Sequence, residues 1–91
     1  MGSVPINNMH LYILKNNSSG KYYIGVTNNI ERRLREHNNA NKHFTGRADG
    51  KWVVLFSKVF NSKIEARREE LRLKKAKNKK YIDWYILNQG P

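Results

Sequence analysis

The sequence predicts a small α/β sandwich of the α+β type, in which helices flank a three-stranded, mainly antiparallel sheet. Three observations support this prediction. Two runs of β-branched and aromatic residues are separated by a polar turn, a third run follows a basic helical segment, and two further helical segments end the chain. This order, β-β-α-β-α-α, is typical of one sheet covered by helices.

The first two strands are expected at residues 11–14 and 22–26. Gly20, in the Asn- and Ser-rich link between them, suits a turn position with positive φ. Gly25 stands inside the second strand, where a glycine normally weakens pairing and packing. It therefore indicates that a helix or a ligand approaches the backbone closely at this point.

The first helix is expected at residues 30–38, after a Thr-Asn-Asn segment that suits a helix cap. Ile30 and Leu34 form its apolar stripe. Arg33 and His37 are four residues apart and share a neighbouring face, which points toward the edge of the hairpin. A core would not require an arginine and a histidine there.

The middle of the chain is expected to form a loop and a strand. Residues 38–51 are polar and rich in Asn and Gly, and a loop of this length often carries function. Residues 52–60 begin as a continuous apolar block. A strand of this kind is typical of the centre of a sheet, with both faces covered.

The second helix is expected at residues 63–77, opened by a capping box of Ser62 and Glu65. At about 100° per residue, Glu69 lies beside the apolar stripe of this helix. A carboxylate at such a position requires a partner. The same projection leaves Glu65 and Glu70 open as alternatives.

The last helix is expected at about residues 80–87, with Asn78 ending the preceding helix or capping this one. It is strongly apolar and should therefore pack on the core. Trp52, Trp84 and Tyr85 are assigned to that core and not to base stacking.

The composition favours a nucleic-acid partner. The 91 residues include 18 Lys and Arg against 7 Asp and Glu, a formal net charge of +11. A membrane surface fits less well, because no segment is long and apolar enough to span a bilayer. Without cysteine, disulfides and thiolate zinc sites are excluded. We expect residues 1–8 to be disordered or a cloning remnant, residues 9–91 to form one domain, and the protein to be intracellular and cytoplasmic, with use at the nucleoid.

The ordered motifs resemble the GIY-YIG nucleases. The first triplet keeps only Tyr12 of its family pattern, whereas residues 23–25 match Tyr-Ile-Gly fully. Arg33 and His37 reproduce the arginine helix of the family, and Glu69 aligns with its metal-binding glutamate. The resemblance implies a small, standalone, single-domain member similar to the nuclease domain of structure-specific DNA resolvases.

This resemblance implies a metal-dependent endonuclease that hydrolyses phosphodiester bonds in DNA. Tyr12 would be the general base, with Tyr23 positioning the water or sharing that role. Arg33 would clamp the scissile phosphate, and His37 would bond a tyrosine hydroxyl or the phosphate. Glu69 would hold one divalent cation, Mg²⁺ or Mn²⁺. A free phenol has a pKa of about 10, so nearby cations would have to favour the phenolate.

Further nucleic-acid contacts are expected from Lys21, Arg32, Arg35, His43, Arg47, Arg67 and Asn78. The sequence leaves open the substrate structure, DNA against RNA, the oligomeric state, and whether the pathway is DNA repair, recombination or mobile-element maintenance. Two rival interpretations remain. A catalytically silent, basic nucleic-acid-binding module explains the charge but not a carboxylate beside phosphates. An assembly domain acting through the apolar C-terminal helix leaves the Tyr, Arg, His and Glu set unexplained.

Overall fold

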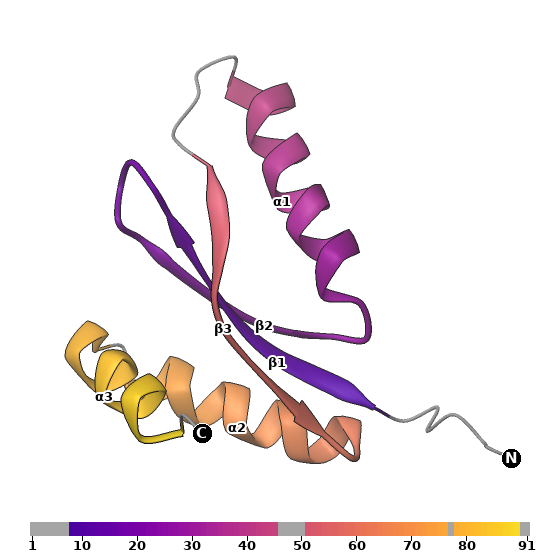
Figure 1. The fold of residues 1–91 in the computed structure, drawn as a ribbon, viewed down its shortest axis with the longest axis vertical. Coiled ribbons are helices and arrows are strands. Elements are labelled where there is room, and N and C mark those ends of the chain that lie inside the picture. Colours follow the sequence, from indigo (N-terminus) through magenta and orange to yellow (C-terminus); the bar gives the residue numbers. More distant parts are fainter. Residues whose placement is uncertain (1–7, 46–50, 77, 90–91) are drawn as a thin grey trace, which may run out of the picture.

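A three-stranded antiparallel sheet lies between two layers of helices in this computed structural model, which describes residues 8–45, 51–76 and 78–89 (Figure 1). The α+β class and the order β-β-α-β-α-α confirm the sequence prediction. The strands are β1 (Met9–Asn16), β2 (Tyr22–Thr27) and β3 (Trp52–Phe60). The helices are α1 (Ile30–Thr45), α2 (Lys63–Ala76) and α3 (Lys79–Gln89).

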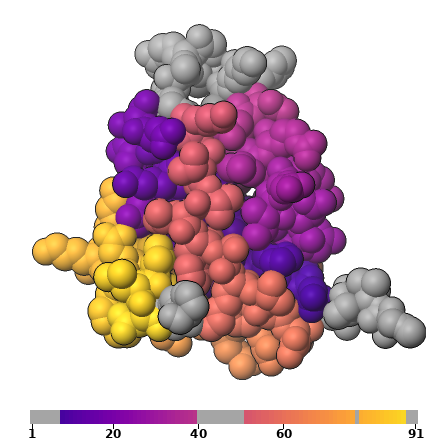
Figure 2. All heavy atoms as spheres, in the orientation of Figure 1, coloured from indigo at the N-terminus to yellow at the C-terminus, as the bar shows by residue number. Residues whose placement is uncertain are grey.

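Strand β1 is the centre of the sheet, because the strand order is β2-β1-β3. The prediction of a central third strand was therefore wrong. After α1 the chain returns to the side of β1 that β2 leaves open, and β3 pairs there as an edge strand of the sheet. Phe56 and Phe60 of β3 pack on the core, whereas Val54 and Val59 are exposed. Figure 2 shows β3 on the surface, between α1 and α3. A continuous apolar run thus did not indicate the position of its strand.

Helix α1 covers one face of the sheet, and α2 with α3 cover the other (Figure 1). The second of these layers contains the apolar core. Its buried members come from β1, β2 and both C-terminal helices, and they are Leu11, Ile13, Ile24, Leu73, Ile82 and Tyr85. None of the helices in the described part of the chain is long and apolar enough to cross a membrane.

The turns and caps follow the sequence closely. Gly20 has φ +75°, as its position in the hairpin link predicted. Asn29 Oδ1 accepts a hydrogen bond from Arg32 N at 3.0 Å and caps α1, and Ser62 Oγ accepts one from Glu65 N at 3.2 Å at the start of α2.

Two other expectations required correction. Helix α1 continues to Thr45, well into the predicted loop, because neither glycine nor proline interrupts it before Gly46. Trp84 is 53% exposed, whereas its neighbour Tyr85 is buried in the core as predicted. Adjacent helical residues point about 100° apart, so both cannot face the core. Residues 1–7 of the segment expected to be disordered lie outside the described residues.

Candidate active site

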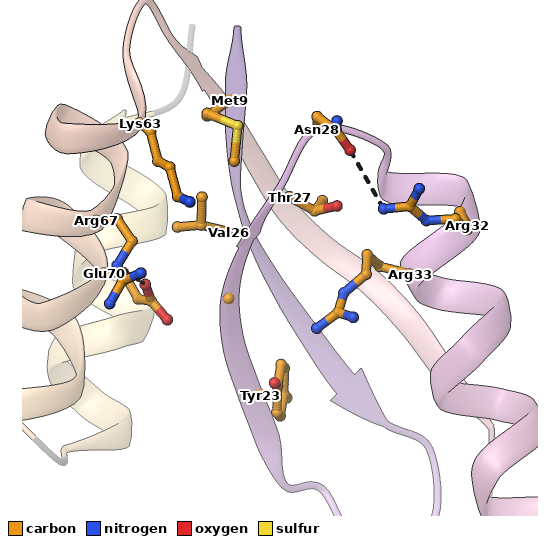
Figure 3. Close-up of a pocket in the computed structure, with 11 residues that line it drawn as sticks. Met9, Tyr23, Val26, Thr27, Asn28, Arg32, Arg33, Lys63, Arg67 and Glu70 are labelled. Atoms are coloured by element: carbon orange, nitrogen blue, oxygen red, sulfur yellow. Dashed lines mark hydrogen bonds and ion pairs between the residues drawn. The ribbon is translucent and has the colours of Figure 1, made fainter. Parts of the chain in front are cut away.

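A polar hollow of about 540 Å³ opens beside the edge strand β2, between α1 and α2 (Figure 3). Tyr23 lines it from β2, and cations line it from both helices. Four cations and one carboxylate share the opening, which suits a phosphate-bearing ligand. These charged residues are Arg32, Arg33, Lys63, Arg67 and Glu70.

Gly25 makes room for the ring of Tyr12. The β1–β2 register places the two residues opposite each other. A Cβ at Gly25 would lie 2.5 Å from Tyr12 Oη and 2.7 Å from Cζ, which is too close for any side chain. Tyr12 is fully buried, so its ring has little space to move. The close neighbour of this glycine is thus a cross-strand tyrosine, where we had expected a helix or a ligand.

The hydroxyl of Tyr12 lies near the guanidinium of Arg33 without a well-formed hydrogen bond. Neither Tyr12 Oη nor Arg33 Nε has a hydrogen-bond partner among the described residues. Burial raises the pKa of Tyr12 above 10.0, Arg33 opposes this shift, and Tyr23 and Glu70 add to it. Tyr23, Arg33 and Glu70 therefore all lie within electrostatic reach of the Tyr12 hydroxyl, and Tyr12 and Arg33 retain unused hydrogen-bonding capacity.

The two arginines of α1 are held by neighbours on their own chain segment. Arg33 Nη1 donates to Glu36 Oε1 at 3.1 Å, and Arg32 Nη2 donates to Asn28 Oδ1 at 3.4 Å. These contacts use only part of each guanidinium. Arg32 Nε also lies 3.7 Å from Glu36 Oε2, and the other donors of the two guanidinium groups can meet phosphate oxygens in the hollow.

His37 packs edge-on against Tyr23, with ring centroids 4.3 Å apart, and lies 6.0 Å from the ring of Trp52. Its Nε2 is buried and has no hydrogen-bond partner among the described residues. Burial lowers the pKa of His37, and the nearby Arg33 lowers it further. The imidazole is therefore mainly neutral near pH 7.

Glu70 is the acid of the hollow. Its side chain is only 13% exposed, and its carboxylate lies 2.8 Å from Lys74 Nζ and 3.8 Å from Arg67 Nε. In Figure 3, Glu70 and Arg67 stand on α2, across β2 from Arg33 on α1. The carboxylate is therefore paired with two cations of its own helix.

Glu69, the acid that the sequence analysis selected, lies on the other flank of α2. Its carboxylate is 3.6 Å from Arg72 Nη1. It also faces Tyr85, whose pKa is raised first by burial and then by this carboxylate. Glu69 and Glu70 flank the same buried stripe, Ala66 and Leu73. The helical projection kept Glu70 as an alternative to Glu69, but it could not show which flank of α2 faces β2.

The other residues predicted to contact nucleic acid lie partly at the hollow and partly elsewhere. Arg67 and Arg32 line the hollow, but Arg35 does not. Lys21 lies at the other end of β2, in a shallow depression with Asn78. Asn78 caps α3, since its Oδ1 accepts from Lys80 N at 2.9 Å. The side chains of His43 and Arg47 lie outside the described residues.

Sequence reasoning missed Lys63 and Asn28, which also line the hollow. A signal for Lys63 was present. Lys63, Arg67 and Glu70 recur at spacings of four and three residues, which places them on one face of a helix.

The residues of the hollow could hold a divalent cation through one carboxylate, with water and substrate phosphates as the other ligands. Among the described residues, no group of three His, Cys, Asp or Glu side chains could hold a metal. Mg²⁺ is commonly bound by one or two carboxylates, with water and substrate phosphates completing its shell. A single, largely buried carboxylate at the wall of an open hollow meets that requirement.

Comparison with known protein families identifies the domain. The model described as "GIY-YIG catalytic domain" matches residues 8–82, and the chain therefore belongs to the GIY-YIG family.

Within this family the chain is similar to UPF0213 proteins. It is 37% identical over 67 residues to one from Halobacterium salinarum, covering 71% of this chain and 83% of that protein. It is 35% identical over 79 residues to one from Bacillus licheniformis, covering 84% and 81%. The solution NMR structure of a UPF0213 protein from Bacillus halodurans has a TM-score of 0.56 and 30% identity, covering 92% of this chain and 88% of that one. The UPF0213 name specifies no reaction.

Proposed function

We propose that this chain is an endonuclease that hydrolyses phosphodiester bonds in DNA with one divalent cation, Mg²⁺ or Mn²⁺. GIY-YIG domains are generally nucleases, which gives the class. The observation that carries the proposal is the meeting of Tyr23, Arg33 and Glu70 at one hollow, with the buried ring of Tyr12 directly behind Gly25 in its wall. Hydrolysis requires an activated water and stabilisation of the charge that develops on the phosphate, and these residue types provide both.

Arg33 binds the scissile phosphate in this proposal. Its Nε lacks a protein partner, and a guanidinium offers two parallel donors to phosphate oxygens. Arg32, Lys63 and Arg67 surround the same opening and hold the flanking backbone. These contacts read charge and shape, not sequence.

Glu70 holds the cation, in place of Glu69. The bound cation would stabilise negative charge on the phosphate and on the leaving oxygen. Lys74 and Arg67, which pair with this carboxylate in the structure, would face the DNA backbone beside a cation held there.

Tyr12 accepts the proton of the attacking water, and Tyr23, which lines the hollow, positions that water. The resting phenol is protonated, because burial raises its pKa. Arg33 opposes this shift and so favours the phenolate. The fraction of Tyr12 in the phenolate form rises with pH. Cleavage should therefore increase into the alkaline range.

A cleavage panel tests the proposal. Labelled linear duplex, flap, branched and single-stranded DNA are incubated with Mg²⁺, Mn²⁺ or EDTA, using wild type and Glu70→Gln. We expect metal-dependent cleavage of at least one substrate by wild type, absent with EDTA and reduced about a hundredfold or more in the variant. Binding of every substrate without any cleavage would instead support the silent, basic binding module, which the net charge of +11 also explains.

A further inference from the structure

Helix α3 carries a stacked pair of aromatic rings at the surface. The rings of Tyr81 and Trp84 have centroids 5.7 Å apart and an interplanar angle of 27°. Tyr81 is partly buried against the core, whereas Trp84 leaves about half of its surface open. We call Tyr81 and Trp84 the α3 aromatic pair. The pair therefore presents the face or edge of an indole to solvent on a helix that otherwise packs on the core.

One cation contacts the pair directly, and two nearby acids are engaged by other side chains. Arg72 Nη2 donates to Tyr81 Oη at 3.3 Å, which fixes the ring of Tyr81 in position. Asp83 accepts a hydrogen bond from Tyr22 Oη at 2.5 Å, and Glu69 pairs with Arg72. Lys75 and Lys80 are exposed on the two helices that meet here. The surroundings therefore suit a polyanion better than an apolar protein surface.

The outer surface of α2 joins this pair to the hollow. At about 100° per residue, cations of α2 lie both on the flank of Glu70 and on the flank of Arg72, and the exposed Ile64 and Leu71 lie between these two groups. α2 and α3 lie side by side on one face of the sheet (Figure 1). The cations on this route are all exposed, and they are Lys74, Arg67, Lys75, Arg68 and Arg72.

We infer that the α3 aromatic pair stacks an unpaired nucleobase of a strand that runs over α2 from the hollow. Every base offers a π-face, so an exposed indole beside phosphate-binding cations forms a stacking platform for single strands. The substrate class is then DNA with a single-stranded segment near the cleavage position. This inference rests on the proposed function for the role of the hollow, but the binding it describes does not.

The test uses the fluorescence of Trp84. The chain has two tryptophans, so a Trp52→Phe background leaves Trp84 as the only indole. The probes are an oligothymidylate of about 15 nucleotides, a blunt duplex with the same number of phosphates, and that duplex with a single-stranded overhang. Trp84→Leu and Trp84→Phe, made in wild type, are compared for affinity at one salt concentration, with circular dichroism confirming the fold.

The expected result is quenching of Trp84 by the oligothymidylate and the overhang but not by the blunt duplex. Trp84→Leu should weaken binding of the single-stranded probes about fivefold to a hundredfold, with less than about a twofold change for the duplex, and Trp84→Phe should retain most of the affinity.

Equal loss for all three probes, or no quenching, would overturn the inference. So would loss of self-association in Trp84→Leu with DNA affinity intact, because exposed Leu87 lies on the same helix and would then belong to a protein interface. Quenching without cleavage of any DNA would retain this inference and refute the proposed nuclease.

Discussion

The two faces of the sheet differ in what their buried groups contact. On the α2–α3 face, apolar side chains such as Leu11, Ile13 and Leu73 fill the core. Among the described residues, three buried polar atoms on the α1 face lack a hydrogen-bond partner, namely Tyr12 Oη, Arg33 Nε and His37 Nε2, against one on the α2–α3 face, Tyr85 Oη. Unpartnered buried polar groups cost stability. One face therefore supplies most of the stability, and the other retains hydrogen-bonding capacity that a bound phosphate can use.

Truncation of the core should produce the largest loss of stability. Leu73 is fully buried, so Leu73→Ala should lower the free energy of unfolding by about 2–5 kcal/mol. Cleavage per folded molecule should change by less than about twofold, because Leu73 does not line the hollow. Urea titration and initial rates below the transition measure both quantities. A rate that falls in proportion to stability would show that the two faces are not separable.

Gly25→Ala should affect both faces, because its Cβ would collide with Tyr12. We expect a loss of about 1–3 kcal/mol in stability and a larger proportional loss of cleavage. A double-mutant cycle with Tyr12→Leu provides the control. If the ring of Tyr12 is the cause, Gly25→Ala should cost much less in the Tyr12→Leu background, and equal costs in both backgrounds would rule this cause out.

Tyr12→Phe should separate stability from activity. Removing a buried hydroxyl without a partner should leave the protein equally stable or about 1 kcal/mol more stable. The alkaline increase in cleavage should disappear, whereas Tyr23→Phe should retain it at a lower rate. The pH–rate profiles of the two variants provide the measurement, and wild-type activity in Tyr12→Phe would remove Tyr12 from the mechanism.

His37 should give the smallest effect, visible only in the pH dependence of stability. Its pKa is lowered in the folded state, so the unfolded chain binds more protons once the pH falls below about 6.5. Stability should consequently decrease as the pH falls through that value, and His37→Gln should show a shallower decrease. The other two histidines are common to both proteins, so parallel pH profiles would argue against this linkage.

Local features of the fold were predictable from the sequence. The hairpin with Gly20, the caps at Asn29 and Ser62, and the joint position of Arg33 and His37 all depend on residues a few positions apart. Tertiary arrangement was not predictable in the same way. The edge position of β3 depends on which side of β1 the chain returns to, and a hydrophobic run carries no information about that choice.

The assignment of the acid shows the same distinction within the site. Glu69 and Glu70 both flank the buried stripe of α2, so the helical period ranks them almost equally. The two glutamates differ only in which of them lies on the side of α2 that faces β2. The packing of α2 against the sheet determines that side. Trp84 was likewise assigned to the core from its type, although Tyr85 beside it takes the inward direction.

The central claim is that Glu70, and not its neighbour, serves the hollow. Glu70→Gln and Glu69→Gln are matched variants, because each removes one charge from adjacent positions of α2 and leaves the side-chain length unchanged. Single-turnover cleavage with saturating Mg²⁺ or Mn²⁺ measures the difference directly. The account predicts a loss of about a hundredfold or more for Glu70→Gln and less than about threefold for Glu69→Gln. Equal losses, or a larger loss for Glu69→Gln, would contradict it.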